Sequence, residues 1–393
     1  MRLAILVTHP VQYFAPVFRE LAQYTNLELK VFFGCDHGTK HQEDQNFGVS
    51  FKWDCEPTIG YDHECLSNSS IKDLAKSSGV KVAFQALYKI NKYKPDVVLI
   101  FSYAPIFITL STLLLRIAGY RLMLRAETTD EALSRSTIKD NLRKWILTSY
   151  YRQFKHFFPI GTNSWNHYQR MGISSDNMST AFYAIDVEFF QKQIDLWQPQ
   201  RAQLRAAAGI KPQDKVLIYC GKMFSDKNPL LIPQALGLLS QEEKKNLWFI
   251  AVGDGELRSD FEKAAKRELG SRSLFVGFKN QSQLGEYYAM ADILILPSRK
   301  GETWGLVVNE ALQFGLRVIV SDKVGSSKDL ISSTNQGSKF ISGDSQSLAD
   351  SINFVIQEES ESDFKMKLPH PIDLSNQIYI QIKDLTKTAG KSQ

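Results

Sequence analysis

The stretch Pro297–Ser321, PSRKGETWGLVVNEALQFGLRVIVS, decides the fold of this chain. It follows the apolar run Asp292–Pro297, DILILP, whose length suits a buried strand better than a helix. After a polar loop, an apolar helical segment begins at Leu306 and ends at Phe314-Gly315, where glycine is a typical residue after a helix. Another apolar run follows. The stretch therefore predicts a strand–loop–helix–strand unit of a parallel sheet.

Gly305 stands where that helix is expected to begin. The first backbone N–H groups of a helix have no partner inside it, and the positive end of the helix dipole lies there, so anions bind at such a position. Glu302 lies just before the helix and Glu310 about one turn inside it. A carboxylate accepts two hydrogen bonds from a vicinal diol, as on a ribose or a hexose. The pattern therefore indicates a site for an anion that carries sugar hydroxyls.

Glu302 and Glu310 are separated by seven residues, with Trp304-Gly305 between them and Tyr287–Ile293 before them. This arrangement resembles the signature of the retaining nucleotide-sugar glycosyltransferases of family four. The resemblance implies the two-domain GT-B fold, with Glu310 on the donor's ribose, Glu302 on its sugar and the amides of 305–307 on its diphosphate. The alternative is that Glu310 lies on a solvated helix face and Glu302 in a surface loop.

Length and composition set limits on the class of protein. The 393 residues exceed one ordinary core, so two domains are expected. The net charge of +5 divides almost evenly, +3 up to Phe190 and +2 beyond it, which gives no indication of a nucleic-acid partner. The four cysteines form no Cys-x-x-Cys pair, and we expect reduced thiols in a cytoplasmic protein. The longest apolar stretch, Ala104–Leu115, is too short to span a bilayer, so a soluble or peripheral protein is expected.

The first half of the chain alternates short apolar runs with helical segments. Strands are expected at Arg2–Thr8, Leu27–Gly34, Lys94–Phe101 and Arg121–Ala126, and helices at Pro16–Ala22 and Ile106–Gly119. This alternation predicts an α/β fold with a doubly wound parallel sheet, in which ligands bind beyond the carboxyl ends of the strands. The side chains that we assign to the acceptor at those ends are His9, Gln12, Tyr13, Tyr103 and Glu127.

Three stretches of this half depart from the common family pattern and resemble a bacterial subgroup of family four. They are His9–Tyr13 (HPVQY) in place of a glycine-rich loop, Phe47–Asp54 (FGVSFKWD) and Arg125–Glu127 (RAE). Glu127 is a candidate contact to the sugar or the acceptor, and the alternative is an ion pair with Arg125. His9 is either a packed loop residue or a general acid or base.

Residues Asn141–Phe158, NLRKWILTSYYRQFKHFF, mix basic with aromatic side chains. We expect a helix here, and two interpretations remain open. A basic amphipathic helix can rest on an anionic membrane, which would bring the enzyme to the inner face of the membrane and to a lipid-linked acceptor. An ordinary domain helix would have a solvated basic face.

The second half opens with an expected strand at Lys215–Gly221. In the loop that follows, two lysines and a glycine at a strand-to-helix junction suit a diphosphate. The family pattern is Gly-Arg-x4-Lys, so the resemblance implies that Gly221, Lys222 and Lys227 bind the donor's diphosphate, with lysine in place of arginine. The alternative is a solvated pair of lysines. By the same resemblance, Phe278-Lys279 lies at the nucleobase.

Four parts are expected along the chain. They are a first Rossmann-like domain on the acceptor side (1–190), a hinge (191–212), a second Rossmann-like domain that binds the nucleotide sugar (213–365), and a crossover helix with a tail (366–393). Residues Lys323–Leu330 and Gly337–Ser342 are expected to complete the second sheet. The resemblance implies that the two domains face a central cleft.

These features predict a retaining glycosyltransferase that moves a sugar, expected from a UDP-sugar, to a hydroxyl of a glycan, a lipid-linked sugar or a small molecule. The candidate catalytic residues are Glu302, Lys227, Lys222 and Glu127, and further donor contacts are expected from Thr303, Trp304, Leu306 and Val307. No Asp-x-Asp occurs, so we expect no metal and no other cofactor, because cations and a helix terminus can stabilise the leaving diphosphate. The rival functions are a nucleotide-sugar epimerase and a non-catalytic nucleotide-sugar-binding protein.

Overall fold

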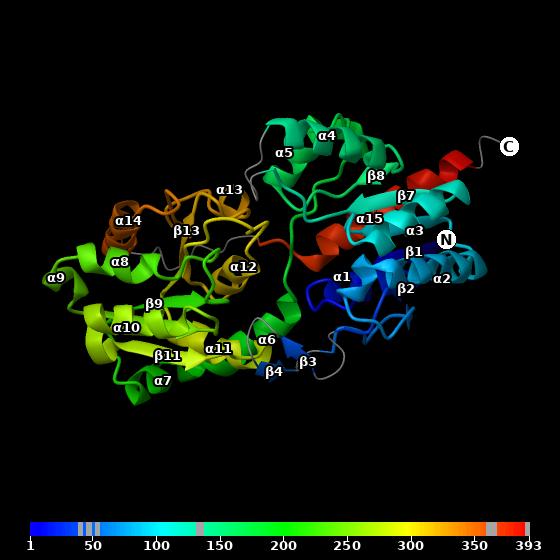
Figure 1. Cartoon of the computed structure of the whole chain (residues 1–393). Coiled ribbons are helices and arrows are strands. Elements are labelled where there is room, and N and C mark those ends of the chain that lie inside the picture. The colour runs from blue at the N-terminus through cyan, green and yellow to red at the C-terminus, as the bar shows by residue number, and fades with distance from the viewer. Residues whose placement is uncertain (38–41, 45–48, 52–55, 131–136, 359–367, 390–393) are drawn as a thin grey trace.

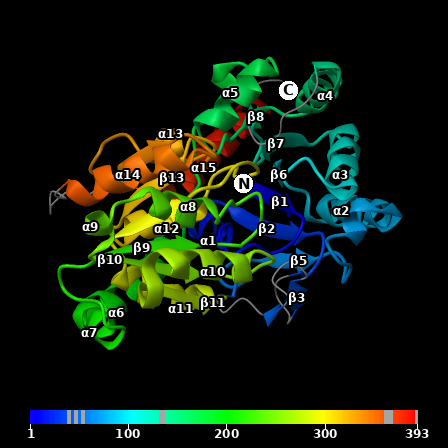
Figure 2. The ribbon, with the colours of Figure 1, turned by 60° about the vertical axis from the view of Figure 1, so that its left-hand side comes forward.

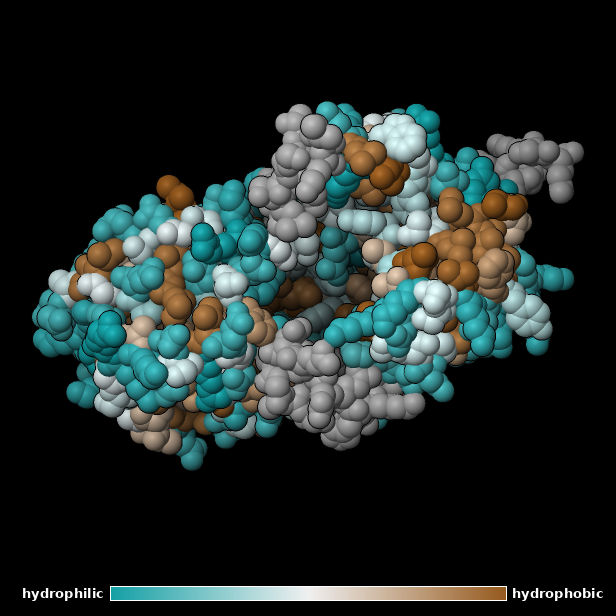
Figure 3. Space-filling model, viewed as in Figure 1, coloured by the Kyte–Doolittle hydropathy of each residue, from teal (hydrophilic) through white to brown (hydrophobic). Residues whose placement is uncertain are grey.

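Two lobes stand side by side, and each is built around a six-stranded sheet (Figure 1). The computed structural model describes residues 1–37, 42–44, 49–51, 56–130, 137–358 and 368–389. All pairings within the two sheets are parallel, which confirms the predicted α/β fold with two doubly wound sheets. Figure 3 shows the surface hollowed between the lobes.

The first lobe has the strand order β5-β2-β1-β6-β7-β8. Its strands are β1 (Arg2–Val7), β2 (Glu28–Phe33), β5 (His63–Cys65), β6 (Val97–Phe101), β7 (Arg121–Arg125) and β8 (His156–Phe157), and a separate hairpin joins β3 (Gln42–Asp44) to β4 (Val49–Phe51). The direction in which successive strands are added reverses between β1 and β6. From β1 the sheet continues outward to β2, and from β6 it continues in the opposite direction to β7. In open α/β sheets a ligand crevice forms at such a switch point.

Helices cover both faces of the first sheet, so β6 is apolar throughout and β1 is apolar and buried after Arg2. The helices of this lobe are α1 (Ala15–Ala22), α2 (Ser77–Tyr93), α3 (Ile106–Ile117), α4 (Thr137–Tyr151) and α5 (Thr162–Arg170). On one face, α2, α3 and α4 pack into a single core with the sheet, and Figure 2 shows them one after another along the right-hand edge. On the other face, α1 packs with the C-terminal helix α15 (Pro371–Ala389).

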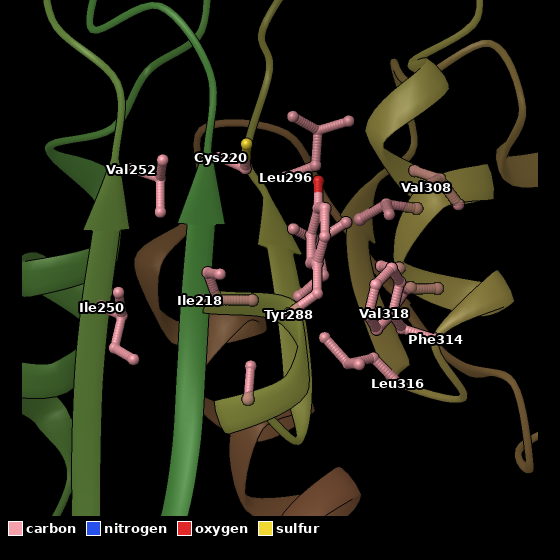
Figure 4. Packing of buried hydrophobic residues seen from close by; sticks show 14 of the residues in the cluster. Ile218, Cys220, Ile250, Val252, Tyr288, Leu296, Val308, Phe314, Leu316 and Val318 are labelled. Carbon is pink, nitrogen blue, oxygen red and sulfur yellow. The ribbon is translucent and has the colours of Figure 1, made fainter. Parts of the chain in front are cut away.

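The second lobe repeats the plan with the order β11-β10-β9-β12-β13-β14. Its strands are β9 (Lys215–Cys220), β10 (Leu247–Val252), β11 (Ser273–Gly277), β12 (Ile293–Leu296), β13 (Arg317–Ser321) and β14 (Gly337–Phe340). Its helices are α8 (Leu231–Leu238), α9 (Gln241–Lys244), α10 (Arg258–Leu269), α11 (Gln281–Met290), α12 (Leu306–Gln313), α13 (Ser327–Leu330) and α14 (Ser345–Gln357). The predicted unit around Pro297–Ser321 is β12, a loop, α12 and β13. Figure 4 shows part of the core that these elements share with α11.

The chain crosses between the lobes twice. After the first sheet, α6 (Val187–Trp197) packs against α11 and α12 of the second lobe, and α7 (Arg201–Ala207) leads to β9. Near the C-terminus, α15 returns to the first lobe, where Leu374, Ile378 and Ile382 join its core. The domain boundaries given above remain a prediction.

Two expected elements are wrong. The helix expected over Asn141–Phe158 ends at Tyr151, because Phe157 turns into the sheet within β8 and is buried there. Lys323–Leu330 is a turn followed by α13, since its amides at Gly325 and Ser326 donate to carbonyl oxygens of the loop before α12. Most of the predicted subgroup motif Phe47–Asp54 lies outside the described residues.

Candidate active site

The loop before α12 is held by a glycine turn and by hydrogen bonds from neighbouring segments. Gly305 has a φ of 93°, which side-chain-bearing residues rarely adopt, and caps the start of the helix. Trp304 is buried and donates its indole N–H to Asn309 Oδ1 at 2.8 Å. Asn309 in turn donates to the carbonyl oxygen of Tyr183 at 3.1 Å, which ties α12 to the first lobe. The N-terminus of α12 is therefore held in place before any ligand binds.

A lysine and a glutamate meet beside that terminus. Lys227 Nζ lies 2.5 Å from Glu302 Oε2, and Ser298 Oγ donates to the same oxygen at 2.9 Å. The lysine side chain is 28% exposed and the glutamate 14%, so the pair is shielded but reachable. Lys227 comes from the loop after β9 and Glu302 from the loop after β12, which are neighbouring strands. The structure thus places two predicted residues from separate loops in contact.

The other predicted donor residues lie at the ends of strands of the second sheet or at the start of α12. Gly221 and Lys222 follow β9 directly, and the Lys222 carbonyl oxygen accepts a hydrogen bond from Tyr219 Oη at 2.7 Å. Thr303 lies in the loop before α12. Leu306 and Val307, the first residues of α12, are half-buried. Phe278 and Lys279 follow β11, and Lys279 Nζ lies 5.6 Å from the ring centre of Tyr287.

Glu310 is buried inside a polar cluster. Its Oε2 accepts a hydrogen bond from Tyr288 Oη at 2.8 Å, and its Oε1 accepts one from Tyr13 Oη of the first lobe at 3.0 Å. Burial raises the pKa of Glu310 to about 7, although both tyrosine hydroxyls favour the carboxylate. Figure 4 shows the Tyr288 hydroxyl pointing toward Cys220 and Leu296 at the carboxyl ends of β9 and β12. Glu310 is 1% exposed and Tyr13 covers Oε1, so we expect Tyr13 to move when a ribose binds there.

The first lobe has a cavity of about 340 Å³ at the carboxyl ends of β1, β6 and β7. Three predicted acceptor-side residues, His9, Tyr103 and Glu127, line it. Gln12 is buried and Tyr13 reaches Glu310 instead. The cavity thus gathers three of the five predicted residues.

Glu127 faces both the cavity and the second lobe. Its Oε1 accepts from Tyr183 Oη at 2.7 Å, and its Oε2 lies 3.4 Å from Thr303 Oγ1, in the loop that carries Glu302. His9 also lines the cavity, where its Nδ1 lies 2.9 Å from Thr8 Oγ1. Burial lowers the pKa of His9 to about 4, so its imidazole is neutral at pH 7.

Arg125 forms part of the cavity wall and is buried. It donates to the carbonyl oxygens of Ala181 at 2.8 Å and Phe158 at 3.5 Å, and its guanidinium lies 5.4 Å from the Tyr183 ring centre. No ion pair of 4.0 Å or less joins Arg125 to Glu127, both of which are described residues. The alternative of an Arg125–Glu127 ion pair is therefore wrong, because the guanidinium donates its hydrogen bonds to backbone carbonyl oxygens after β8 instead.

Several residues on which the site depends had no role assigned to them from the sequence. Tyr183, Tyr288 and Ser298 each hold a carboxylate, and none stands at a motif spacing from its partner. A further link between lobes joins the Thr162 amide to Asp329 Oδ2 at 3.0 Å. Such contacts join distant parts of the chain, and only the weak signal of a polar residue inside an apolar segment, as at Tyr288, could have indicated them.

Two features are absent from the described residues. No group of three or more His, Cys, Asp or Glu side chains among them could hold a metal ion. Within the same residues, no helix combines the length and the apolar character needed to cross a membrane.

Comparisons by sequence detect similarity to glycosyltransferases over part of the chain. Residues 200–368 match the family model described as Glycosyl transferases group 1. Lipopolysaccharide 1,2-N-acetylglucosaminetransferase of Salmonella typhimurium is 32% identical over 133 residues, which cover 32% of this chain and 35% of that protein. The Campylobacter jejuni enzyme named GalNAc-α-(1→4)-GalNAc-α-(1→3)-diNAcBac-PP-undecaprenol α-1,4-N-acetyl-D-galactosaminyltransferase is 28% identical over 38% of this chain and 40% of its own length. The matched part of this chain thus spans less than half of either relative.

Comparisons by structure extend over both lobes. A glycosyltransferase from Rickettsia africae has a TM-score of 0.68 at 16% identity and covers 98% of each chain. Anabaena HepE in complex with UDP and glucose has a TM-score of 0.64 at 17% identity and covers 100% of each chain. Together with the two parallel sheets, these likenesses confirm the predicted GT-B fold.

Proposed function

We propose that this chain, whose residues 200–368 form a glycosyl transferases group 1 domain, is a retaining glycosyltransferase that moves a sugar from a nucleoside diphosphate sugar to an acceptor hydroxyl. The observation that carries the proposal is the meeting of Lys227 with Glu302 at the N-terminus of α12, opposite a cavity that contains Glu127. In this proposal, a cation, a helix terminus and two carboxylates face the hollow between the lobes (Figure 3).

The donor's diphosphate would lie against the second lobe. Lys227 and Lys222 supply positive charge, and the amides of 305–307 supply hydrogen-bond donors at the start of α12. When the bond between the sugar's anomeric carbon and the phosphate oxygen breaks, negative charge grows on the diphosphate. Fixed cations and amides stabilise that charge without reorganising, which lowers the barrier. We expect this to suffice without a metal ion.

The carboxylates would hold the hydroxyls on either side of the diphosphate. Glu302 lies beside Lys227, so it can accept hydrogen bonds from the transferred sugar while the lysine contacts phosphate. Glu310 would accept from the ribose once Tyr13 has left Oε1. Across the space, Glu127 would orient the acceptor hydroxyl, whose proton passes to the leaving phosphate oxygen as the new bond forms on the same face of the sugar.

The nature of the two substrates is part of the proposal. UDP is the nucleotide we expect, and its support is the bound UDP in the structurally similar Anabaena protein. For the acceptor, the names of the relatives point to lipopolysaccharide and undecaprenol-linked sugars. We therefore propose a glycan or lipid-linked acceptor at the first-lobe cavity and a cytoplasmic site of action.

A transfer assay tests the proposal. The chain is incubated with UDP-, GDP- and ADP-sugars, with and without lipid-linked glycan acceptors, and products are identified by mass spectrometry and NMR. We expect one donor to lose its sugar in an acceptor-dependent reaction, with the α-anomer of the donor giving an α-linked product, and Glu302→Gln to slow it. Conversion of a donor to an isomer without acceptor would show an epimerase instead. Binding without any reaction would show a binding protein.

A further inference from the structure

One outer face of the first lobe is formed by three helices that lie side by side. The inner sides of α2, α3 and α4 share a core with the sheet, and Thr112 Oγ1 of α3 lies 2.9 Å from Tyr150 Oη of α4. Because the inner sides all face the same sheet, the outer sides face the same direction, as the right-hand edge of Figure 2 shows. We call this surface the outer helical face.

Large apolar side chains project from this face. Eight of the fifteen exposed large apolar residues among the described parts of the chain lie on these three helices, which make up about a ninth of its length. They are Phe84 and Tyr88 on α2, Ile106, Leu113 and Ile117 on α3, and Leu142, Trp145 and Ile146 on α4. Ile117 is 83% exposed and Trp145 is 70% exposed, so neither side chain contributes to the hydrophobic core. Figure 3 shows apolar side chains gathered where Figure 1 places α3.

The charges on this face have one sign. Neither α2 nor α3 contains an aspartate or glutamate. Seven cations on or next to the three helices are exposed and, within the described residues, lie more than 4 Å from any carboxylate: Lys81, Lys92, Lys94, Arg116, Lys144, Arg152 and Lys155. The acid of α4, Asp140, is paired with Arg170 at 2.7 Å. The face is thus apolar with a cationic surround.

Helix dipoles explain only part of this pattern. Cations are favoured near the C-terminal end of a helix, which accounts for Lys92, Arg116 and Arg152. That effect does not extend to Lys81 in the second turn of α2 or to Lys144 in the middle of α4. Nor does it explain exposed Trp145 and Ile117. Exposed apolar surface that a core does not need marks an interaction surface.

We infer that the outer helical face rests on an anionic lipid bilayer. Tryptophan and tyrosine favour the level of the lipid headgroups, lysine and arginine are attracted to anionic lipids, and aliphatic side chains enter the acyl boundary. A bilayer accepts projecting side chains from three helices without a matching groove. The inference does not rest on the proposed transfer of a sugar, and it covers three helices rather than the single one expected from the sequence.

The first-lobe cavity lies next to this face. Ile106, which begins α3, belongs to the face, and the cavity is lined by Tyr103 and Ala104 just before it. A bilayer against the outer helical face therefore lies near the part of the cavity wall that Tyr103 and Ala104 form. This position suits an acceptor that remains anchored in the membrane.

Vesicle co-sedimentation of the full chain tests the inference. Phosphatidylcholine vesicles, alone or mixed with phosphatidylglycerol, are compared at low and high salt. We expect binding to the mixed vesicles that weakens at high salt. Lys81→Glu with Arg116→Glu and Lys144→Glu should weaken it by about tenfold or more, and so should Ile117→Ser with Trp145→Ser. Equal binding to neutral vesicles, or binding to neither kind, would overturn the inference.

Matched controls come from the second lobe. The triple variant Lys211→Glu, Lys263→Glu and Arg267→Glu changes the net charge by the same amount as the charge reversal on the outer helical face. The double variant Leu238→Ser and Ile341→Ser removes two exposed apolar side chains, as the serine variant of that face does. Both should bind like the wild type. Equal losses in these controls, or a dimer of the chain that Trp145→Ser dissolves in analytical ultracentrifugation, would contradict the assignment to lipid.

A spectroscopic measurement locates the contact independently of folding. Vesicles should shift the tryptophan emission of the wild type to the blue, and Trp145→Phe should remove the shift while binding persists. An unchanged shift in that variant would place the contact elsewhere. A chain that transfers sugar but ignores vesicles contradicts only this inference. One that binds vesicles without transferring sugar contradicts only the proposed function.

Discussion

The two lobes share one plan of sheet and helices but build their sites differently. In the second lobe, Ser298, Glu302 and Gly305 belong to one short loop, and only Lys227 comes from another strand end. In the first lobe, the cavity collects side chains from three strand ends, and Glu127 takes its orientation from Tyr183, 56 residues later. A local site is fixed by local sequence, whereas a dispersed one depends on the whole lobe. The predictions below separate a donor role for the second lobe from an acceptor role for the first.

Lys227→Ala should have the largest effect on the reaction. Its ammonium lies beside Glu302 at the start of α12, where charge on the leaving diphosphate would grow. Removing one such group typically lowers kcat by about 100-fold or more. Steady-state kinetics with saturating acceptor measure this. Lys300→Ala is the matched control, because Lys300 lies in the next strand-end loop but is 62% exposed and pairs with Asp226. Wild-type rates in Lys227→Ala would show that Lys227 does not stabilise the leaving diphosphate.

Donor binding should depend on pH through Glu310. Burial raises the pKa of Glu310 to about 7, so in the protein without donor about half of the Glu310 carboxyl groups are protonated at pH 7. Ribose hydroxyls donate hydrogen bonds, so the bound state favours the carboxylate. Affinity should therefore be constant above pH 7 and fall by up to about tenfold per pH unit below it. Calorimetry with a UDP-sugar is suitable, because its diphosphate, unlike the terminal phosphate of free UDP, does not titrate near pH 6.

Glu310→Gln is the control for that titration. It should remove the pH dependence and weaken the donor by about tenfold above pH 7, since a neutral acceptor makes weaker hydrogen bonds than a carboxylate. His9 does not interfere, because its pKa of about 4 lies below the range of the experiment. A pH profile that Glu310→Gln leaves unchanged would exclude Glu310 from the donor site.

Glu127→Gln should distinguish the acceptor role of the first lobe from the donor role of the second most clearly. Its carboxylate faces the first-lobe cavity, so we expect about a tenfold loss in kcat/KM for the acceptor, the scale of one hydrogen bond to a charged group. The calorimetric affinity for the donor should stay as in the wild type. A weakened donor with an unchanged acceptor KM would reverse the assignment of the two lobes.

Removal of metal ions should have the smallest effect. Lys222, Lys227 and the start of α12 supply the positive charge in the proposed reaction, so EDTA should leave kcat unchanged. The rate is measured before and after chelation and again with added Mn²⁺ or Mg²⁺. Activity lost with EDTA and restored by either cation would show that these groups are insufficient.

Much of the fold could be predicted because apolar runs and helical spacing recur in both halves. The strands near Arg2, Lys215 and Asp292 are continuous in the sequence and buried on both faces, which is the pattern of a parallel sheet. The errors were at Phe157 and at Lys323–Leu330. In both places tertiary contacts override local preference. The segment with Phe157 joins the edge of the first sheet, and Lys323–Leu330 forms hydrogen bonds to the loop before α12.

The candidate site could be predicted only where its residues are close in sequence. The spacing of Glu302 and Glu310 and the glycine before α12 indicated an anion site with two carboxylates. The spacing did not indicate that Tyr13 from the other lobe would bond to Glu310, or that Arg125 would turn to backbone carbonyls. Those contacts form between segments that meet only after both sheets have folded, and no pattern within either segment encodes them.

A crystal structure of the chain with bound UDP would locate the donor site. We expect the diphosphate between Lys227 and the first amides of α12, with Tyr13 displaced and the ribose hydroxyls within hydrogen-bonding distance of Glu310. UDP bound in the first-lobe cavity, or a Lys227–Glu302 site left empty at saturating UDP, would contradict this expectation.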